Sequence, residues 1–334
     1  MELWLAISLA FAFALTNGLH DAANAIATLV ATRGARPGPA IALSAAFNLL
    51  GALLVGTAVA STIAGIVTVP PAQAVAVIGS GVLAAVLWNL LTWSRGLPSS
   101  SGHALVGGLV GAALAEGGLD AVRWGGLDGW RPVGVFGVLI ALAISPVFGL
   151  GFGFAVSRVG RRLLRRATRH VRSPIHSAQW AMSAALSFSH GANDAQKAMG
   201  VVGALLVADG RLQTFGVPLW ATLGCGIALT LGTSMGGWRI VRTIGRRIFR
   251  LAPLDGFASQ SASTAVILAS SYAGAPVSTT HVVASSVVGV GGGRRRWRHV
   301  RWAVVQSMGF AWLLTLPVTA AAGAATFLVW TTIS

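Results

Sequence analysis

A short polar phrase occurs twice in this chain, each time inside an otherwise apolar segment. Residues 17–25 read Asn-Gly-Leu-His-Asp-Ala-Ala-Asn-Ala, and residues 190–198 read His-Gly-Ala-Asn-Asp-Ala-Gln-Lys-Ala. The glycine, the aspartate and the final alanine recur at a constant offset of 173 residues. A carboxylate in hydrocarbon is costly and usually marks a path for an ion or a substrate. The duplication therefore predicts one buried site, made by two related halves of a membrane protein, as in secondary transporters.

The composition agrees with a membrane location. Of the 334 residues, 54% are hydrophobic and only 10% are charged, whereas a soluble protein has about 25% charged residues. Several apolar segments approach or exceed the ~20 residues that cross a bilayer. The segments lie near 3–30, 39–69, 73–93, 98–118 and 133–157, and near 177–207, 215–237, 255–273, 276–291 and 300–333.

The net charge of +16 comes largely from three arginine-rich stretches, 158–172, 239–250 and 294–301, which hold 17 of the 24 basic residues. Short positive loops beside apolar segments stay in the cytoplasm and contact anionic lipid headgroups. We therefore interpret the charge as a membrane signal and exclude nucleic-acid binding.

With these stretches inside, each half crosses the membrane five times and both termini lie outside, as does the polar loop 120–131. An odd number of crossings inserts the second half upside down relative to the first. The sequence predicts membrane repeat 1 at 1–157, a basic cytoplasmic linker at 158–176 and an inverted membrane repeat 2 at 177–334. The predicted fold class is an all-α polytopic protein of the cell membrane.

A second phrase is also duplicated. Residues 96–103 read Gly-Leu-Pro-Ser-Ser-Ser-Gly-His, and residues 274–281 read Gly-Ala-Pro-Val-Ser-Thr-Thr-His, at an offset of 178. Proline breaks the helix, and the hydroxyl residues suit the N-cap of a helix that restarts after them. Such broken or re-entrant helices at the midplane would present free N–H groups and dipole ends to an oxyanion. The predicted anion ligands are Ser100, Ser101, Ser278, Thr279 and Thr280, joined by Asn24 and Asn193.

The duplicated aspartates, Asp21 and Asp194, would repel an oxyanion. They make sense if a cation or a proton travels with the anion and neutralises the pocket. Asn24 and Asn193 also offer amide oxygens of the kind that coordinate hard cations. In place of Asn24 the second phrase carries Lys197, the only lysine of the chain, which either balances Asp194 or extends to the membrane surface.

Four histidines lie in or beside the phrases, and each is a candidate proton relay or a packing residue: His20, His103, His190 and His281. Cys225 is the only cysteine, so the chain has no cysteine metal site and no intrachain disulfide. We expect no resident cofactor or metal.

With its two pairs of phrases, the chain resembles the inorganic phosphate transporter (PiT) family, from the first span to about residue 293. The resemblance implies cation-coupled uptake of inorganic phosphate, an inverted repeat and a homodimer. Within the family, the chain resembles the bacterial low-affinity, proton-linked type more closely than the sodium-coupled type. Asn48 and Gln260 stand where sodium-coupled relatives resemble one another in carrying glutamates, and His20 stands where the common pattern has asparagine.

The resemblance thus implies proton symport, with Asp21, Asp194, Lys197, His20, Gln260 and Asn48 as coupling residues. A divalent metal would accompany phosphate if the substrate is a neutral metal-phosphate complex. Asp194→Asn should abolish coupled uptake.

Four alternatives stay open: sodium coupling, a sulfate or other oxyanion permease, a passive channel and an intramembrane enzyme. The last rests on residues 232–236, which match Gly-x-Ser-x-Gly. That motif needs a strand-to-helix turn, whereas here it ends an apolar helix and favours close helix packing.

Overall fold

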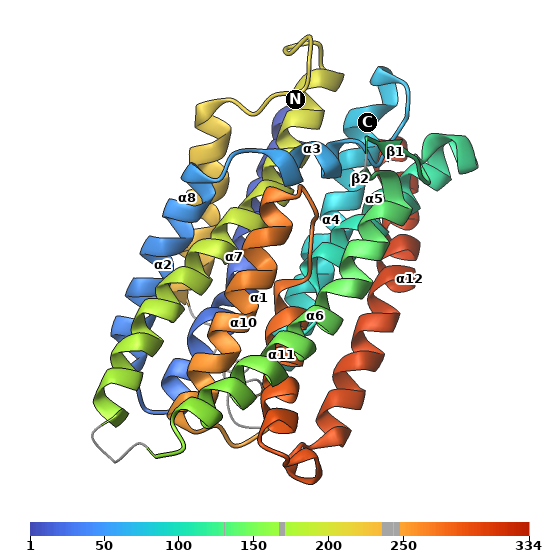
Figure 1. Cartoon of the computed structure of the whole chain (residues 1–334). Helices are drawn as coiled ribbons and strands as arrows, with labels where there is room; N and C mark the ends of the chain where they lie inside the picture. The colour runs from blue at the N-terminus through green and yellow to red at the C-terminus, as the bar shows by residue number, and fades with distance from the viewer. Residues whose placement is uncertain (130, 167–170, 236–242, 244–247, 334) are drawn as a thin grey trace.

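The computed structural model describes residues 1–129, 131–166, 171–235, 243 and 248–333. Helices run nearly parallel in one bundle, with both termini at the same end (Figure 1). The first half contains α1 (Glu2–Ala31), α2 (Pro37–Leu54), α3 (Ala58–Ala64), α4 (Pro71–Arg95), α5 (Ser101–Gly117) and α6 (Gly134–Leu163). The second contains α7 (Arg172–Ala208), α8 (Leu219–Met235), α10 (Pro253–Tyr272), α11 (Thr279–Gly293) and α12 (Trp302–Ile333).

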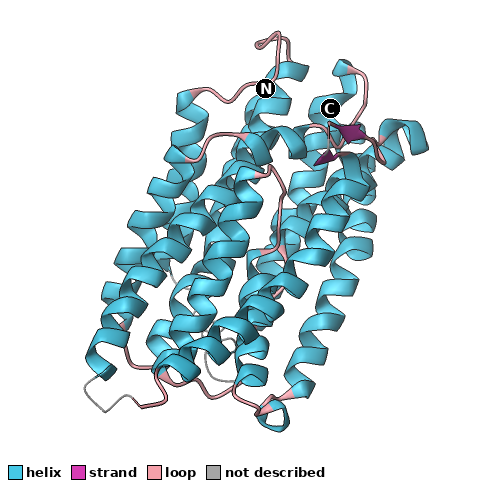
Figure 2. Ribbon diagram, viewed as in Figure 1, coloured by secondary structure: helices cyan, strands magenta, loops and turns pink. Residues whose placement is uncertain are grey.

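Irregular structure lies at the ends of the bundle. Two 3-10 turns, Gly118–Ala121 and Trp297–His299, follow α5 and α11. The strands β1 (Leu127–Asp128) and β2 (Arg131–Pro132) form a small antiparallel ribbon near the termini (Figure 2). This ribbon lies at the end of the loop 120–131 that the sequence places outside.

Each predicted apolar segment coincides with a helix, with one correction. Segment 39–69 is divided into α2 and α3, because Gly56 between them takes the left-handed conformation (φ 84°) that glycine readily adopts. α6 and α7 also extend into the predicted linker, 158–176, since arginine is a good helix former and continues a helix beyond its apolar part.

Among the described residues, six helices are long and apolar enough to cross a membrane: α1, α2, α4, α5 with the turn after it, α6 and α12. α7 is longer than any of these, at 37 residues, but its polar phrase lowers its hydropathy. The exposed faces of α6 and α12 are rich in large apolar residues, as suits a lipid-facing surface.

The two phrase-bearing helices run in opposite directions. In Figure 1, α1 starts at the end with both termini, and α7 starts at the opposite end. The described parts of the arginine-rich stretches 158–172 and 294–301 lie at that opposite end, which we take as cytoplasmic. Most of stretch 239–250 lies outside the described residues. This antiparallel course is what an inverted repeat requires; the inverted relation itself stays a prediction.

The halves interlock through glycine contacts at their phrase-bearing helices. A Cβ added to Gly18 of α1 would lie 2.1 Å from the backbone of α8, and one at Gly232 of α8 would lie 2.0 Å from that of α1. Gly191 of α7 and Gly51 of α2 make the matching contact, at 1.9 and 2.0 Å. The duplicated glycines therefore allow close helix crossings between halves.

The outer helices interlock in the same way. A Cβ at Gly111 of α5 would lie 1.8 Å from the backbone of α12, and one at Gly289 of α11 would lie 2.1 Å from that of α6. Each half thus places its last helix against the hairpin of the other half, α4–α5 or α10–α11.

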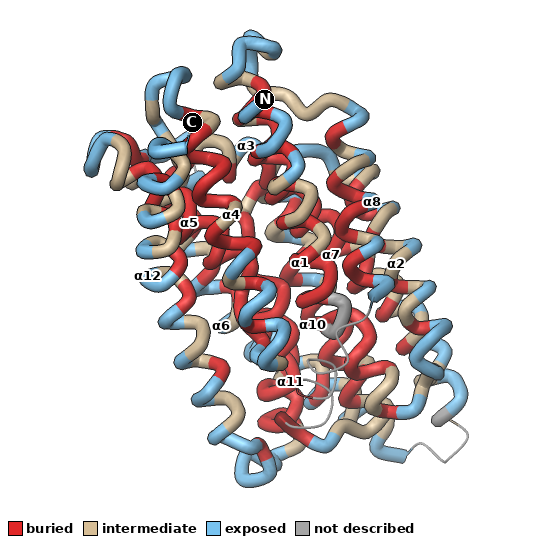
Figure 3. Tube along the Cα trace, turned by 180° about the vertical axis from the view of Figure 1, so that it is seen from behind, coloured by how far each residue is buried: buried red, intermediate tan, exposed pale blue. Residues whose placement is uncertain are grey.

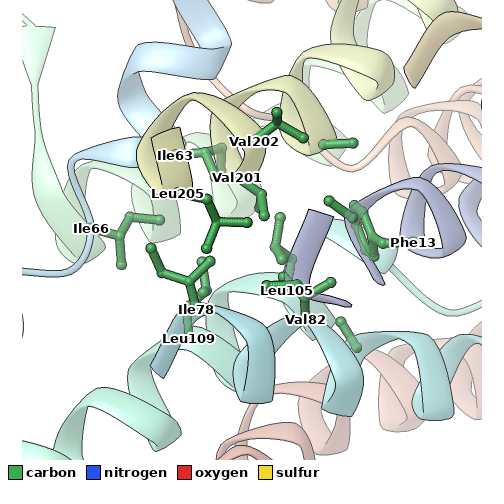
Figure 4. Close-up of a cluster of buried hydrophobic side chains, with 14 of the residues drawn as sticks. Phe13, Ile63, Ile66, Ile78, Val82, Leu105, Leu109, Val201, Val202 and Leu205 are labelled. Atoms are coloured by element: carbon green, nitrogen blue, oxygen red, sulfur yellow. The ribbon is translucent and has the colours of Figure 1, made fainter. Parts of the chain in front are cut away.

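Burial is highest along the inner helices, whereas α6 and α12 expose one face over most of their length (Figure 3). The largest apolar cluster joins α1, α3, α4, α5 and α7 (Figure 4). Phe13, Ile63, Leu105 and Val201 meet there and are almost fully buried. This core fixes α1 and α7 side by side.

Asp255 ties together the cytoplasmic ends of three helices. Asp255 lies fully buried in the first turn of α10. Its carboxylate pairs with Arg161 of α6. It also pairs with Arg294, which follows α11, at 2.7 Å. The oxygen that meets Arg294 also accepts the Ala252 N–H at 2.8 Å.

We expect Asp255→Ala to lower the free energy of unfolding by about 3 kcal/mol, the lower end of the range for breaking a buried ion pair. We expect the loss of unfolding free energy to be at the lower end of that range because both arginines retain access to water. The Tm in detergent measures the effect. Asp209→Ala, which breaks an exposed pair with Arg211, is the control and should shift Tm little. Equal Tm values for the two variants would contradict the role of Asp255.

Candidate functional site

All the predicted site residues are buried in the middle of the bundle. None of them is more than 4% exposed: Ser100, Ser101, Ser278, Thr279, Thr280, Asn24, Asn193, Asp21, Asp194, Lys197, His20, Gln260 and Asn48. So many buried polar groups in a membrane protein require partners within the protein.

The start of α11 contacts both duplicated aspartates. Thr280 Oγ1 donates to Asp21 Oδ1 at 2.5 Å, and Thr279 Oγ1 donates to Asp194 Oδ2 at 3.0 Å. Asn24 Nδ2 also donates to Asp21 Oδ1, at 2.5 Å, and contacts Thr280 Oγ1 at 3.1 Å. The structure thus joins residues of the two phrases that are more than 250 positions apart in the chain.

Lys197 is buried against Asp194. Its ammonium pairs with the Asp194 carboxylate and donates to the Val277 carbonyl at 2.8 Å. Only 1% of the residue is exposed, so the alternative of a lysine extending to the membrane surface is wrong. Asp194 therefore has a fixed positive partner, and Asp21 has no lysine or arginine within ion-pair distance among the described residues.

His190 lies between the two carboxylates. Its Nε2 is 2.9 Å from Asp194 Oδ2 and 3.7 Å from Asp21 Oδ2. Its Nδ1 is 3.3 Å from Asn48 Oδ1, and Asn48 Nδ2 donates to Thr233 Oγ1 at 3.0 Å. Because that last bond turns the amide oxygen of Asn48 toward the ring, Nδ1 faces an acceptor. Nε2 lies within ion-pair distance of both carboxylates but in hydrogen-bond geometry with neither.

The two hairpins place their helix starts together. Ser100 caps α5 by accepting the His103 N–H at 3.2 Å, and Ser278 caps α11 by accepting the His281 N–H at 3.3 Å. The predicted N-caps are thereby confirmed. The rings of His103 and His281 have centroids 4.9 Å apart, so the N-termini of α5 and α11 meet at one place.

The equivalent residues His20 and Asn193 hold the hairpins in position. His20 Nε2 is 2.8 Å from Thr92 Oγ1 of α4. Asn193 Nδ2 donates to Ser271 Oγ at 3.1 Å and to the Ala275 carbonyl at 3.3 Å. The structure thus places these two side chains against the hairpins.

Ser101 belongs to the same network, because its hydroxyl donates to Asn17 Oδ1 at 2.6 Å. Gln260 of α10 differs: neither atom of its amide has a hydrogen-bond partner among the described residues. Asn24 Oδ1 and His281 Nε2 also lack partners there. Unpaired buried polar atoms of this kind call for water, an ion or a ligand.

Gln196 has a role that the sequence analysis missed. Its Oε1 accepts the N–H groups of Val59 at 2.8 Å and Ala60 at 3.4 Å, and so holds the start of α3 on α7. Thr62 of α3 in turn donates to the Gly274 carbonyl at 2.7 Å. The only sequence signal is that glutamine stands where the first phrase has alanine.

Comparison with known proteins agrees with this geometry. Residues 17–174 and 161–323 each match the Phosphate transporter family, so the family model occurs twice in tandem. The chain belongs to this family. It is 40% identical to a "Probable low-affinity inorganic phosphate transporter" of Rhizobium meliloti (strain 1021), over 94% of this chain and 92% of that one. A protein of the same description from Bacillus subtilis (strain 168) is 36% identical, over 97% and 96%.

A solved structure, "The sodium-dependent phosphate transporter", is similar along the whole of both chains, with a TM-score of 0.87 and 26% sequence identity. The protein is therefore a multi-pass membrane transporter and not an enzyme. The Gly-x-Ser-x-Gly match is explained by packing, since Gly232 contacts the backbone of α1. The homodimer stays a prediction.

Proposed function

We propose that this protein imports inorganic phosphate in symport with protons. The anion would bind where the N-termini of α5 and α11 meet, and the proton would be held by Asp21, His190 and Asp194. The observation that carries the proposal is the meeting of two helix starts beside two carboxylates that share one histidine.

The helix starts supply what an oxyanion needs. Each offers free backbone N–H groups and the positive end of a helix dipole, without permanent charge. The hydroxyls of Thr279 and Thr280, which now donate to the aspartates, would turn to the anion when it arrives. The other expected ligands are Ser100, Ser101, Ser278, Asn24 and Asn193. Protonated phosphate can donate a hydrogen bond to a carboxylate, whereas sulfate at neutral pH cannot, and this favours phosphate over sulfate.

The charges of the site suggest how coupling works. Lys197 balances Asp194 permanently, so one carboxylate, Asp21, is left for a mobile cation. A proton shared between His190 and the carboxylates would neutralise the pocket before phosphate enters. Asn48 supports this role, because it holds His190 as a donor. His20 would stabilise the α4–α5 hairpin, and Gln260, whose buried amide has no partner among the described residues, would take part in coupling.

A second candidate is sodium coupling. The solved relative described as sodium-dependent favours it. Of the ligand atoms of Asp21, His190 and Asp194, which lie within 4.8 Å of one another, the two carboxylate oxygens suit Na⁺ as a hard cation. The same three groups would suit a divalent metal if a neutral metal-phosphate complex is the substrate.

Uptake of labelled phosphate into proteoliposomes separates these cases, with pH and Na⁺ gradients imposed one at a time. We expect an inward proton gradient alone to drive accumulation above the external concentration. Accumulation with a Na⁺ gradient alone would show that the coupling ion is sodium and not a proton. Equilibration without accumulation would indicate a channel, and stronger competition by sulfate than by unlabelled phosphate would indicate another oxyanion.

A further inference from the structure

We propose that a cationic cavity on the outer side of the molecule binds phosphate-class oxyanions before they reach the buried site, an inference that rests on the proposed function. This cavity, called here the outer vestibule, has a volume of about 460 Å³. It lies between α3, the β1–β2 ribbon, the start of α6 and the turn that joins α10 to α11. Residues on its wall include Thr62, Arg123, Asp128, Arg131, Ala141 and Pro276.

The vestibule has an excess of positive charge. Two arginines, Arg123 and Arg131, line it against one carboxylate, Asp128. All three residues are exposed, so an anion in solution can reach them. A guanidinium presents a planar set of donors that matches the oxygens of phosphate, and a hollow of one sign of charge raises the local concentration of the opposite ion.

The backbone around Arg123 is fixed, so this charge does not sit on a loose loop. The Arg123 N–H donates to the Ile66 carbonyl at 3.0 Å, and the Arg123 carbonyl accepts the Val135 N–H at 2.9 Å. Gly134 takes a left-handed conformation (φ 70°) beside it, where an added Cβ would lie 2.4 Å from the Arg123 carbonyl oxygen. Arg131 is held by strand pairing opposite Asp128.

The inner wall of the vestibule is the backbone that covers the buried site. Gly274, Ala275 and Pro276 line the cavity on one side. On the other side, the Ala275 carbonyl accepts from Asn193 at 3.3 Å. The Val277 carbonyl, two residues further, accepts from Lys197 at 2.8 Å. The segment 274–277 therefore lies between the vestibule and the buried residues Asn193 and Lys197.

The kinetics of uptake test the role of the arginines. We expect Arg123→Gln combined with Arg131→Gln to raise the KM for phosphate about tenfold, because the local concentration of the anion falls. Vmax should change less than about twofold, since the buried site is intact. Raising the ionic strength should raise KM in the wild type more than in the double variant. Arg211→Gln is the control, because Arg211 lies on the same side, paired with Asp209, and does not line the vestibule.

A thiol probe tests occupancy directly. In a Cys225→Ala background, Ala141→Cys places one thiol on the vestibule wall. We expect a membrane-impermeant thiol reagent to label it from the outside, and inorganic phosphate to slow the labelling. Labelling that phosphate does not slow, with a KM unchanged in the double variant, would overturn the proposal.

The lipid composition of the vesicles distinguishes free phosphate from a lipid headgroup. If protection by inorganic phosphate is equal in zwitterionic and anionic vesicles, the ligand is the free anion, as proposed. Protection by anionic lipid alone would make the vestibule a headgroup site and overturn the proposal. A different result would contradict the proposed function: no accumulation of phosphate by the wild-type protein under a proton gradient.

Discussion

Replacing Asp21 by asparagine is expected to reduce proton-driven phosphate uptake to the level of empty liposomes. The amide has nearly the same shape and can still accept from Thr280 and Asn24, so the hairpin contact is retained. It has no charge to be neutralised, however, and Asp21 is the carboxylate that Lys197 does not balance. Exchange of internal for external phosphate, which needs no net proton movement, should survive the change.

The two readouts together make this prediction specific. A variant that has lost both uptake and exchange would have lost anion binding, and the coupling role of Asp21 would be wrong. Asp209→Asn is the control, because Asp209 is on the outer loop after α7 and makes only an exposed ion pair. Wild-type accumulation by Asp21→Asn under a pH gradient would contradict the proposal outright.

Lys197→Met is expected to lower both stability and uptake. Methionine fills most of the same space but leaves the Asp194 carboxylate fully buried without its ammonium partner. Leaving one charge of a buried pair unbalanced costs about 3–5 kcal/mol. The Tm in detergent should fall by several degrees, and uptake should be lost because the charge of the site is no longer balanced.

The double variant Asp194→Asn with Lys197→Met separates stability from function. Neither charge is then left without a partner, so most of the lost Tm should return. Uptake should not return, because the carboxylate of Asp194 is absent and Asp194→Asn alone is expected to abolish coupled uptake. A single variant Lys197→Met with wild-type Tm and uptake would show that the pair has no such role.

Much of the site could be predicted from local sequence signals. The Gly-x-Pro phrases break the chain at fixed points, and the hydroxyls after them cap the next helix, so Ser100 and Ser278 were identifiable as N-caps. The burial of Lys197 was one of two predicted outcomes, since a lysine beside an aspartate in a polar phrase can pair with it. These signals act within a few residues of the chain and need no knowledge of tertiary contacts.

The rest depends on contacts between helices that are far apart in sequence. The position of His190 between two carboxylates follows from the packing of α7 against α1, which brings Asp21 to it, and the crossing of α7 with α2 brings Asn48 against the same ring. The capping of α3 by Gln196 needs a break at Gly56 that hydropathy alone does not indicate. Gln260 has no partner in the described structure, so its predicted role in coupling stays a prediction.

The interlocked packing also limits how this molecule can change shape. Rocking one sequence half against the other would pull apart close contacts of the bundle, where α1 meets α8 and α2 meets α7 without side chains between them. We therefore expect the rigid bodies of the transport cycle not to correspond to the two repeats. Each body would contain helices from both halves, so that the protein opens across the duplication and not along it.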